Sequence, residues 1–221
     1  SWNKALRMPT YTDLYISNAV QQGDASLRPE KNSAFKIGSR YRQTGFSAVL
    51  SGFYTHGKDM IDWVQTTETE LTDSKYHVMN IGKLDNMGFN VDAEIYMNEL
   101  LPRCFVTNIR LGYAYINQNH ETETEILKSL YALEYLRHKA VFGLDHKIWS
   151  KLSASWSVRW QQRMNGYHPY TKVDCKVMWN DRKYSVYVKA DNITCHRYYD
   201  LSAVKQPGLW VMAGVSVNLG W

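Results

Sequence analysis

The chain has 221 residues, of which 44% are hydrophobic and 21% charged, and its formal net charge is +5 at pH 7. The 8 Trp and 16 Tyr supply too much apolar ring area for a solvated coil, so a disordered or collagen-like chain is excluded. No apolar run approaches the roughly 18 to 20 residues of a membrane-spanning helix, which excludes a helical membrane protein.

The charged residues, cysteines and histidines indicate which partners and metal sites are not expected. The basic residues do not cluster along the sequence, so the positive charge gives no reason to expect a nucleic-acid partner. Three cysteines at spacings of 71 and 20 fit neither a disulfide framework nor a zinc site, and we expect three free thiols. No pair of the seven histidines has a ligand-like spacing on one strand face, so we expect no metal and no cofactor.

Apolar residues follow a period of two along almost the whole chain, which predicts strands with two unlike faces. In 152–161, for example, apolar Trp156, Val158 and Trp160 alternate with Ser157 and Arg159. The predicted strands, in chain order, lie at about 1–8, 35–42, 46–54, 89–97, 105–115, 140–148, 152–161, 171–179, 184–191 and 209–221. We find no domain boundary and treat 1–221 as a single segment.

The predicted connections alternate in length. Short turns are expected at 42–45, 98–103, 150–151 and 180–183, and long polar loops at 9–29, 66–84, 117–133 and 195–208. Alternating short turns and long loops are typical of outer-membrane barrels, whose turns face the periplasm and whose loops face outward.

Two further features favour a barrel over a soluble sandwich. The predicted strands exceed the usual length in globular sheets and fit a tilted bilayer crossing. Aromatic residues on the apolar faces collect near the strand ends. This placement is typical of membrane barrels, in which aromatic side chains are enriched at both membrane interfaces. The apolar face would then contact lipid, and the charged face would line a hydrated lumen. Candidate lumen-facing residues are Arg40, Arg110, Arg159 and Lys189.

Two other classes stay open at this point. A soluble β-sandwich that binds carbohydrate could use Trp156, Trp160 and Trp179 as sugar platforms. A small outer-membrane barrel enzyme would need a catalytic group, for which the nearest candidates are Ser202, His196 and Asp200. These three residues are loop-borne and have no supporting motif, so we expect no enzyme.

Two motifs near the N-terminus resemble those of a known family. Segment 7–15 reads RMPTYTDLY and segment 23–31 reads GDASLRPEK, similar to the paired signature of TonB-dependent outer-membrane receptors. Near the other end, 191–194 reads DNIT, and the last residue is the aromatic Trp221, which in this family resembles the barrel-assembly signal. The style of the signature looks most like that of bacteroidete receptors for cobalamin or iron chelates.

The resemblance implies an all-β, antiparallel, up-and-down transmembrane barrel. The chain would supply about ten strands of a barrel of roughly 22, and it would be the C-terminal portion of a receptor, without the plug domain. The implied function is import of a scarce large nutrient, cobalamin or an iron chelate such as a siderophore or haem, across the bacterial outer membrane. The implied partners are outer-membrane lipid, the plug and N-terminal barrel strands of the same receptor, the TonB complex and the barrel-assembly machinery.

Loop tyrosines are the candidate ligand contacts, because their rings could stack on a planar ligand such as a corrin or a porphyrin. Packing within the loops, or anchoring at the membrane interface, is the alternative role for the same rings. The candidates are Tyr11, Tyr15, Tyr131, Tyr167, Tyr198 and Tyr199.

Overall fold

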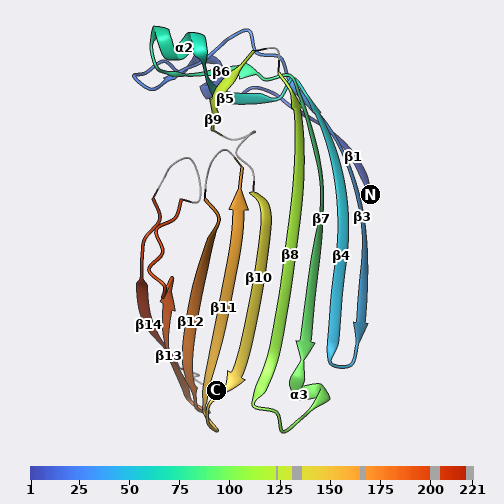
Figure 1. Cartoon of the computed structure of the whole chain (residues 1–221), viewed down its shortest axis with the longest axis vertical. Helices are drawn as coiled ribbons and strands as arrows, with labels where there is room; N and C mark the ends of the chain where they lie inside the picture. The colour runs from blue at the N-terminus through green and yellow to red at the C-terminus, as the bar shows by residue number, and fades with distance from the viewer. Residues whose placement is uncertain (123, 131–135, 165–167, 200–204, 218–221) are drawn as a thin grey trace.

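A single ten-stranded antiparallel sheet makes up most of the protein (Figure 1). The computed structural model describes residues 1–122, 124–130, 136–164, 168–199 and 205–217. In spatial order the strands are β1 (Trp2–Arg7), β3 (Glu30–Gln43), β4 (Phe46–Lys58), β7 (Lys83–Tyr96), β8 (Val106–Glu121), β10 (Leu136–Lys147), β11 (Leu152–Arg163), β12 (Tyr170–Asn180), β13 (Tyr184–Asp191) and β14 (Trp210–Val217). Consecutive strands of this sheet are neighbours in space, which confirms the predicted up-and-down, all-β architecture.

The register confirms that each strand has one apolar and one polar face. On the outer face, residues directly opposite each other on neighbouring strands form continuous rows across the sheet. One row consists of Tyr41, Ala48, Ala93, Leu111, Phe142, Val158 and Val173. Leu50 on this face is 55% exposed and Val215 is 68% exposed. No second sheet covers this face within the described ranges, so its side chains do not form the dry interior of a soluble sandwich.

The predicted short turns are confirmed at one end of the sheet, here called the turn end. β3 and β4 are joined through Gly45, whose φ of +73° favours glycine. β10 and β11, and likewise β12 and β13, are joined by four or fewer residues. The β7–β8 connection contains a short helix, α3 (Met97–Leu100), which the sequence analysis did not predict.

The opposite end, here called the loop end, departs from the prediction. Segments 66–84 and 117–133, expected as polar loops, contain regular structure instead. β7 begins at Lys83 and β8 continues to Glu121. A second, four-stranded sheet is formed by β2 (Gln21–Gln22), β6 (Tyr76–Asn80), β5 (Ile61–Thr66) and β9 (Ile126–Ser129). Helices α1 (Tyr11–Tyr15) and α2 (Thr67–Thr72) lie in the same loop-end connections.

The small sheet contains four of the eight buried apolar side chains of the described residues, Ile61, Trp63, Val64 and Val78. Val64 is fully buried and forms a cluster with Ile81 and Leu84, while Ile61, Trp63 and Val78 form a second cluster. Leu84 belongs to β7 and alternates with the outer-face residues of that strand, so its side chain lies on the inner face. The small sheet is therefore packed against the inner side of the barrel wall at the loop end (Figure 1).

Helices contribute little to this architecture. Within the described residues, none of the helices has the length and apolar character to cross a membrane. The three cysteines are free thiols, as predicted.

Candidate functional site: the lumen face and the loop platform

The inner face of the wall is polar and concave, and here it is called the lumen face. Arg40, Asp92 and Arg159 lie in one row of cross-strand partners on it. A hollow of about 770 Å³ is lined mainly by this face. Its polar lining residues are Lys36, Ser47, Ser51, Asn90, Asp92, Glu94, Arg110, Lys139 and Ser157. Charged walls of both signs keep such a hollow hydrated.

Acidic and basic side chains of the lumen face bind one another across strands. Arg110 on β8 forms an ion pair with Asp145 on β10, with 3.0 Å between Nη1 and Oδ2. Glu94 on β7 accepts hydrogen bonds from the Asn108 amide at 2.7 Å and from the Tyr96 hydroxyl at 2.7 Å. These bonds hold the turn-end half of the lumen face in one arrangement.

The four candidate lumen residues differ in how they are engaged. Arg110 is bound to Asp145, and Lys189 is bound to Asp191 at 2.9 Å. Arg159 and Arg40 have no ion-pair partner within the described part of the chain, and the buried Nε of Arg159 donates to no group there. Arg40 and Arg159 are therefore the two candidates whose charge stays available to a further polar group in the lumen.

The first part of the N-terminal signature builds a loop anchor. Thr10 caps α1 in a capping box with Asp13, which satisfies amides at the start of this short helix. Arg7 on β1 binds both Asp13 at 3.4 Å and Glu30 on β3 at 3.0 Å. Glu30 also accepts a hydrogen bond from the backbone N–H of Ile61 at 3.2 Å. The motif thus ties α1, the barrel wall and the small sheet together.

The second part of the signature attaches the same loop to the small sheet. The Arg28 backbone N–H donates to Asn80 Oδ1 at 2.9 Å, and Asn80 Nδ2 donates back to the Arg28 carbonyl at 3.0 Å. The Arg28 guanidinium pairs with Asp59 at 2.8 Å. At Gly23 a Cβ would lie 2.9 Å from the Asp13 carbonyl oxygen, so glycine is needed for this close backbone approach.

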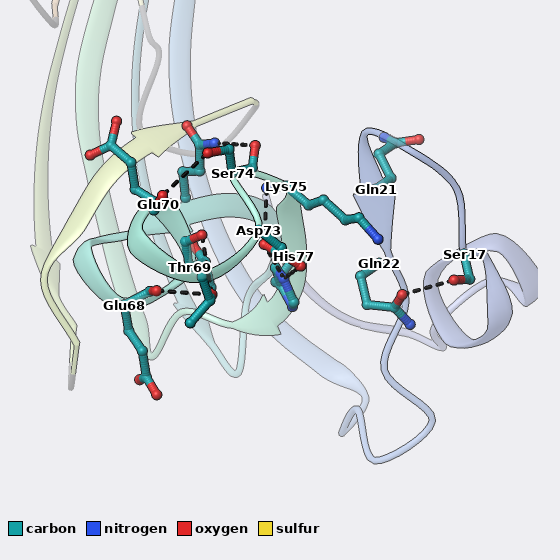
Figure 2. Close-up of polar contacts among 12 residues, drawn as sticks. Ser17, Gln21, Gln22, Glu68, Thr69, Glu70, Asp73, Ser74, Lys75 and His77 are labelled. Carbon is teal, nitrogen blue, oxygen red and sulfur yellow. Dashed lines mark hydrogen bonds and ion pairs between the residues drawn. The ribbon is translucent and has the colours of Figure 1, made fainter.

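The polar edge of the small sheet forms a loop platform, made of α2 and residues 73–77 (Figure 2). His77 Nε2 lies 3.1 Å from Asp73 Oδ2, and the Lys75 backbone N–H donates to Asp73 Oδ1 at 3.0 Å. The hydrogen bond from the Lys75 amide, assisted by His77, lowers the pKa of Asp73. Figure 2 shows Glu68, Glu70 and Lys75 projecting from this platform, while Ser17 and Gln22 bind each other nearby.

The DNIT segment, residues 191–194, attaches the connection between β13 and β14 to the barrel wall. Asn192 is 1% exposed and adopts a positive φ of 54°. Its side chain donates to the carbonyls of His196 and Pro207, at 2.9 and 3.3 Å, and accepts from the His196 N–H at 3.1 Å. Its own N–H donates to Asp174 Oδ1 at 2.8 Å. Asn192 therefore joins both arms of the 192–208 connection to β12.

The four candidate loop tyrosines that lie within the described ranges do not form a single group. Tyr11 and Tyr15 neighbour each other on α1, with ring centroids 5.0 Å apart, and are 80% and 58% exposed. Tyr198 stacks on Tyr170 at 4.6 Å and lines a hollow of about 310 Å³ with Asn192 and Trp210. Tyr199 is 43% exposed. Tyr131 and Tyr167 lie outside the described residues, as do Ser202, Asp200 and Trp221.

The small sheet and the hydrogen bonds by which Asn192 and Asn80 hold the loops were not predicted from the sequence. The DNIT and GDASLRPEK motifs are the signals that could have located these contacts, because both place Asn, Asp or Gly where turns are needed. Within the described ranges, no three His, Cys, Asp or Glu residues gather in a way that could hold a metal ion.

Comparison with known families identifies the class of protein. Residues 1–193 match the family described as TonB dependent receptor-like, beta-barrel. The chain belongs to this family and is located in the bacterial outer membrane. The family consists of receptors and not of enzymes.

Solved structures share the fold at low sequence identity. The copper transporter OprC is 16% identical with a TM-score of 0.72, over 97% of this chain and 36% of that chain. The siderophore receptor PirA from Pseudomonas aeruginosa is 14% identical with a TM-score of 0.65, over 98% and 35%. The outer membrane receptor FpvA from Pseudomonas aeruginosa PAO1, bound to pyoverdine, is 15% identical with a TM-score of 0.65, over 99% and 33%. The chain thus spans about a third of the length of these structures.

Proposed function

We propose that the chain forms one wall of a receptor that actively imports a scarce large nutrient, with energy supplied through TonB. The observation that carries this proposal is the contrast between the two faces of the wall. The outer face is aliphatic and aromatic, whereas the lumen face holds charges of both signs around a hollow of about 770 Å³. Such a wall suits a wide, water-filled path through lipid.

An iron chelate, such as a siderophore or haem, is the nutrient we favour, and cobalamin is the second candidate. The names of PirA and FpvA as siderophore and pyoverdine receptors support an iron chelate. Exposed Tyr11 and Tyr15 at the loop end, with Tyr198 and Tyr199, would contact the ligand first. Tyr131 and Tyr167 stay further candidates from the sequence. The signature style supports a bacteroidete source.

A plug domain is the partner we assign to the lumen face. Arg40 and Arg159 would pair with acidic groups of the plug, since neither has an ion-pair partner within the described ranges. Arg110 and Lys189 already bind Asp145 and Asp191, so they would contribute less to plug contacts. Trp221 would direct the chain to the barrel-assembly machinery.

Growth on a single nutrient source tests the import function. The gene is deleted, and cells are grown with a ferric siderophore or haem as the iron source, or with cobalamin as the required vitamin, with and without functional TonB. We expect growth on one nutrient to require both the gene and TonB. Arg159→Gln should reduce that growth, whereas Arg182→Gln, at an exposed turn, should not. Unchanged growth of the deletion strain on every nutrient would contradict the proposal.

A further inference from the structure

Four lysines gather on the outer face of the wall at the loop end. Lys31 on β3 lies directly opposite Lys58 on β4, and Lys58 lies opposite Lys83 on β7. Lys4 on β1 lies opposite Ser33, two residues along β3 from Lys31. The alternation along these strands runs without a register shift, so the lysines share the outer face with Phe35.

Most of this charge is not neutralised within the described part of the chain. Lys83 binds Glu121 at 2.9 Å, and Asp85 is held by His56 at 2.6 Å and by the Tyr54 hydroxyl at 2.9 Å. Lys4, Lys31 and Lys58 have no acidic partner there, and all three are exposed. Like charges directly opposite each other on neighbouring strands destabilise a sheet. An anion bound between them would remove that cost.

The distance between the lysines and a row of aromatic residues on the same face indicates the source of that anion. Trp2, Phe35 and Tyr54 form one row on the outer face, four residues from the Lys31 and Lys58 row along β3 and β4. Four residues span about 13 Å along a strand, or about 10 Å along the barrel axis at a tilt of 35 to 45°. Because aromatic rings mark the edge of the hydrocarbon layer, the lysines lie at the level of lipid headgroups.

The inner side of the same strand ends is already occupied. Leu84 packs into the small sheet, and a Cβ at Gly57 would lie 2.5 Å from the sulfur of Met60. The outer side carries no such cover from the described residues, so a ligand reaches the lysines from the membrane. We propose that Lys4, Lys31 and Lys58 bind the phosphate groups of a lipid of the surrounding leaflet, whose acyl chains contact Phe35 and Tyr54 below.

The test measures lipid binding by the full-length receptor that carries this chain. The detergent-purified protein is titrated with bisphosphorylated lipid A and with dephosphorylated lipid A, and bound lipid is counted by native mass spectrometry. The variant carries Lys4→Gln, Lys31→Gln and Lys58→Gln. The control carries Arg103→Gln, Lys147→Gln and Lys183→Gln, which removes the same charge from exposed positions near the turn end. A Lys-to-Arg triple at the first three positions keeps the charge.

Each lysine near an anionic surface contributes roughly fivefold to binding, so we expect the variant to bind bisphosphorylated lipid A on the order of 100-fold more weakly. The control and the arginine triple should bind like the unmodified receptor. If the triple variant does not fold, Lys58→Gln alone should weaken binding by about fivefold. Equal binding by variant and control, or equal binding of dephosphorylated lipid A, would overturn the proposal. Displacement of the lipid by millimolar inorganic phosphate would overturn the lipid as the source of the phosphate.

Discussion

Val186 on β13 and Val215 on β14 lie directly opposite each other on the outer face of the wall. Val215 is 68% exposed and Val186 is 37% exposed, although both are aliphatic and each lies two residues inside the end of its strand. Exposed aliphatic pairs of this kind are stable where the surrounding solvent is hydrocarbon.

Arginine at this pair should therefore destabilise the barrel. We expect Val186→Arg or Val215→Arg to lower the free energy of unfolding by about 2 to 4 kcal/mol, because the charge would sit in lipid. Urea unfolding of the full-length receptor in lipid vesicles measures this change. Ser155→Arg is the control, since Ser155 lies between Asp145 and Lys176 on the lumen face. Equal losses at all three positions would show that the faces are assigned wrongly.

The barrel wall was predictable because lipid and water act on opposite faces of each strand. Ala140, Phe142 and Leu144 alternate with Lys139 and Asp145, and the structure keeps that alternation along β10. The period of two is lost where the strands extend beyond the bilayer, since both faces are then polar. Lys83 and Glu121, for example, are outer-face partners that lie in the predicted loops 66–84 and 117–133.

The small sheet was missed for a different physical reason. All six residues of β5 are buried, including Asp62 and Gln65, so no alternation marks it as a strand. The Asp62 carboxylate accepts hydrogen bonds from the Ser129 hydroxyl and the Trp63 N–H, which only the folded arrangement reveals. The loop tyrosines could be listed from the sequence, but their separation into the Tyr11–Tyr15 pair on α1 and the Tyr198–Tyr170 stack depends on tertiary contacts and was not predictable.

The Asn192 side chain should determine how well the backbone around His196 is protected from hydrogen exchange. Replacement by alanine removes the side-chain hydrogen bonds to the backbone of His196 and Pro207. Because both residues are exposed, water can replace part of each lost bond, which then costs about 0.5 to 1.5 kcal/mol. We expect faster hydrogen exchange at the His196 amide in Asn192→Ala. Asn192→Asp keeps the acceptor for that amide and should show a smaller increase, whereas Asn180→Ala at an exposed turn should show none. Unchanged exchange in the alanine variant would contradict the fastening role.

Lys151 and Asp181 connect two neighbouring turns at the turn end, with 2.7 Å between Nζ and Oδ2. The hydrogen bond from Lys151, assisted by the Arg182 backbone N–H, lowers the pKa of Asp181. The same contact raises the pKa of Lys151. A lowered folded-state pKa means that the stabilisation is fully present above the ordinary Asp pKa of about 3.9 and is lost as the pH falls through the lower, folded value.

We expect Lys151→Gln to move the pKa of Asp181 back toward its ordinary value. Carboxyl-carbon NMR titration of the turn measures the shift, and Lys183→Gln, which leaves the pair intact, is the control. The pKa of Asp181 should differ less between Lys151→Gln and the unmodified receptor at high salt, because ions screen this exposed pair. A pKa of Asp181 that is the same in Lys151→Gln and in the control would show that the ion pair does not form in solution.

Val64 should determine whether the small sheet keeps its position on the inner wall. The side chain is fully buried between Ile81 and Leu84, so Val64→Ala leaves a cavity that costs about 1 to 3 kcal/mol. Because the wall has its own ladder of hydrogen bonds, we expect the loss to appear as faster amide exchange in β5 and β6, by about tenfold or more, with little change in β11 and β12. Val20→Ala is the matched control, since Val20 is 60% exposed at the same end of the molecule. Uniformly faster exchange in both sheets would instead mean that the small sheet and the wall unfold as one unit, so that the loop platform does not move independently of the wall.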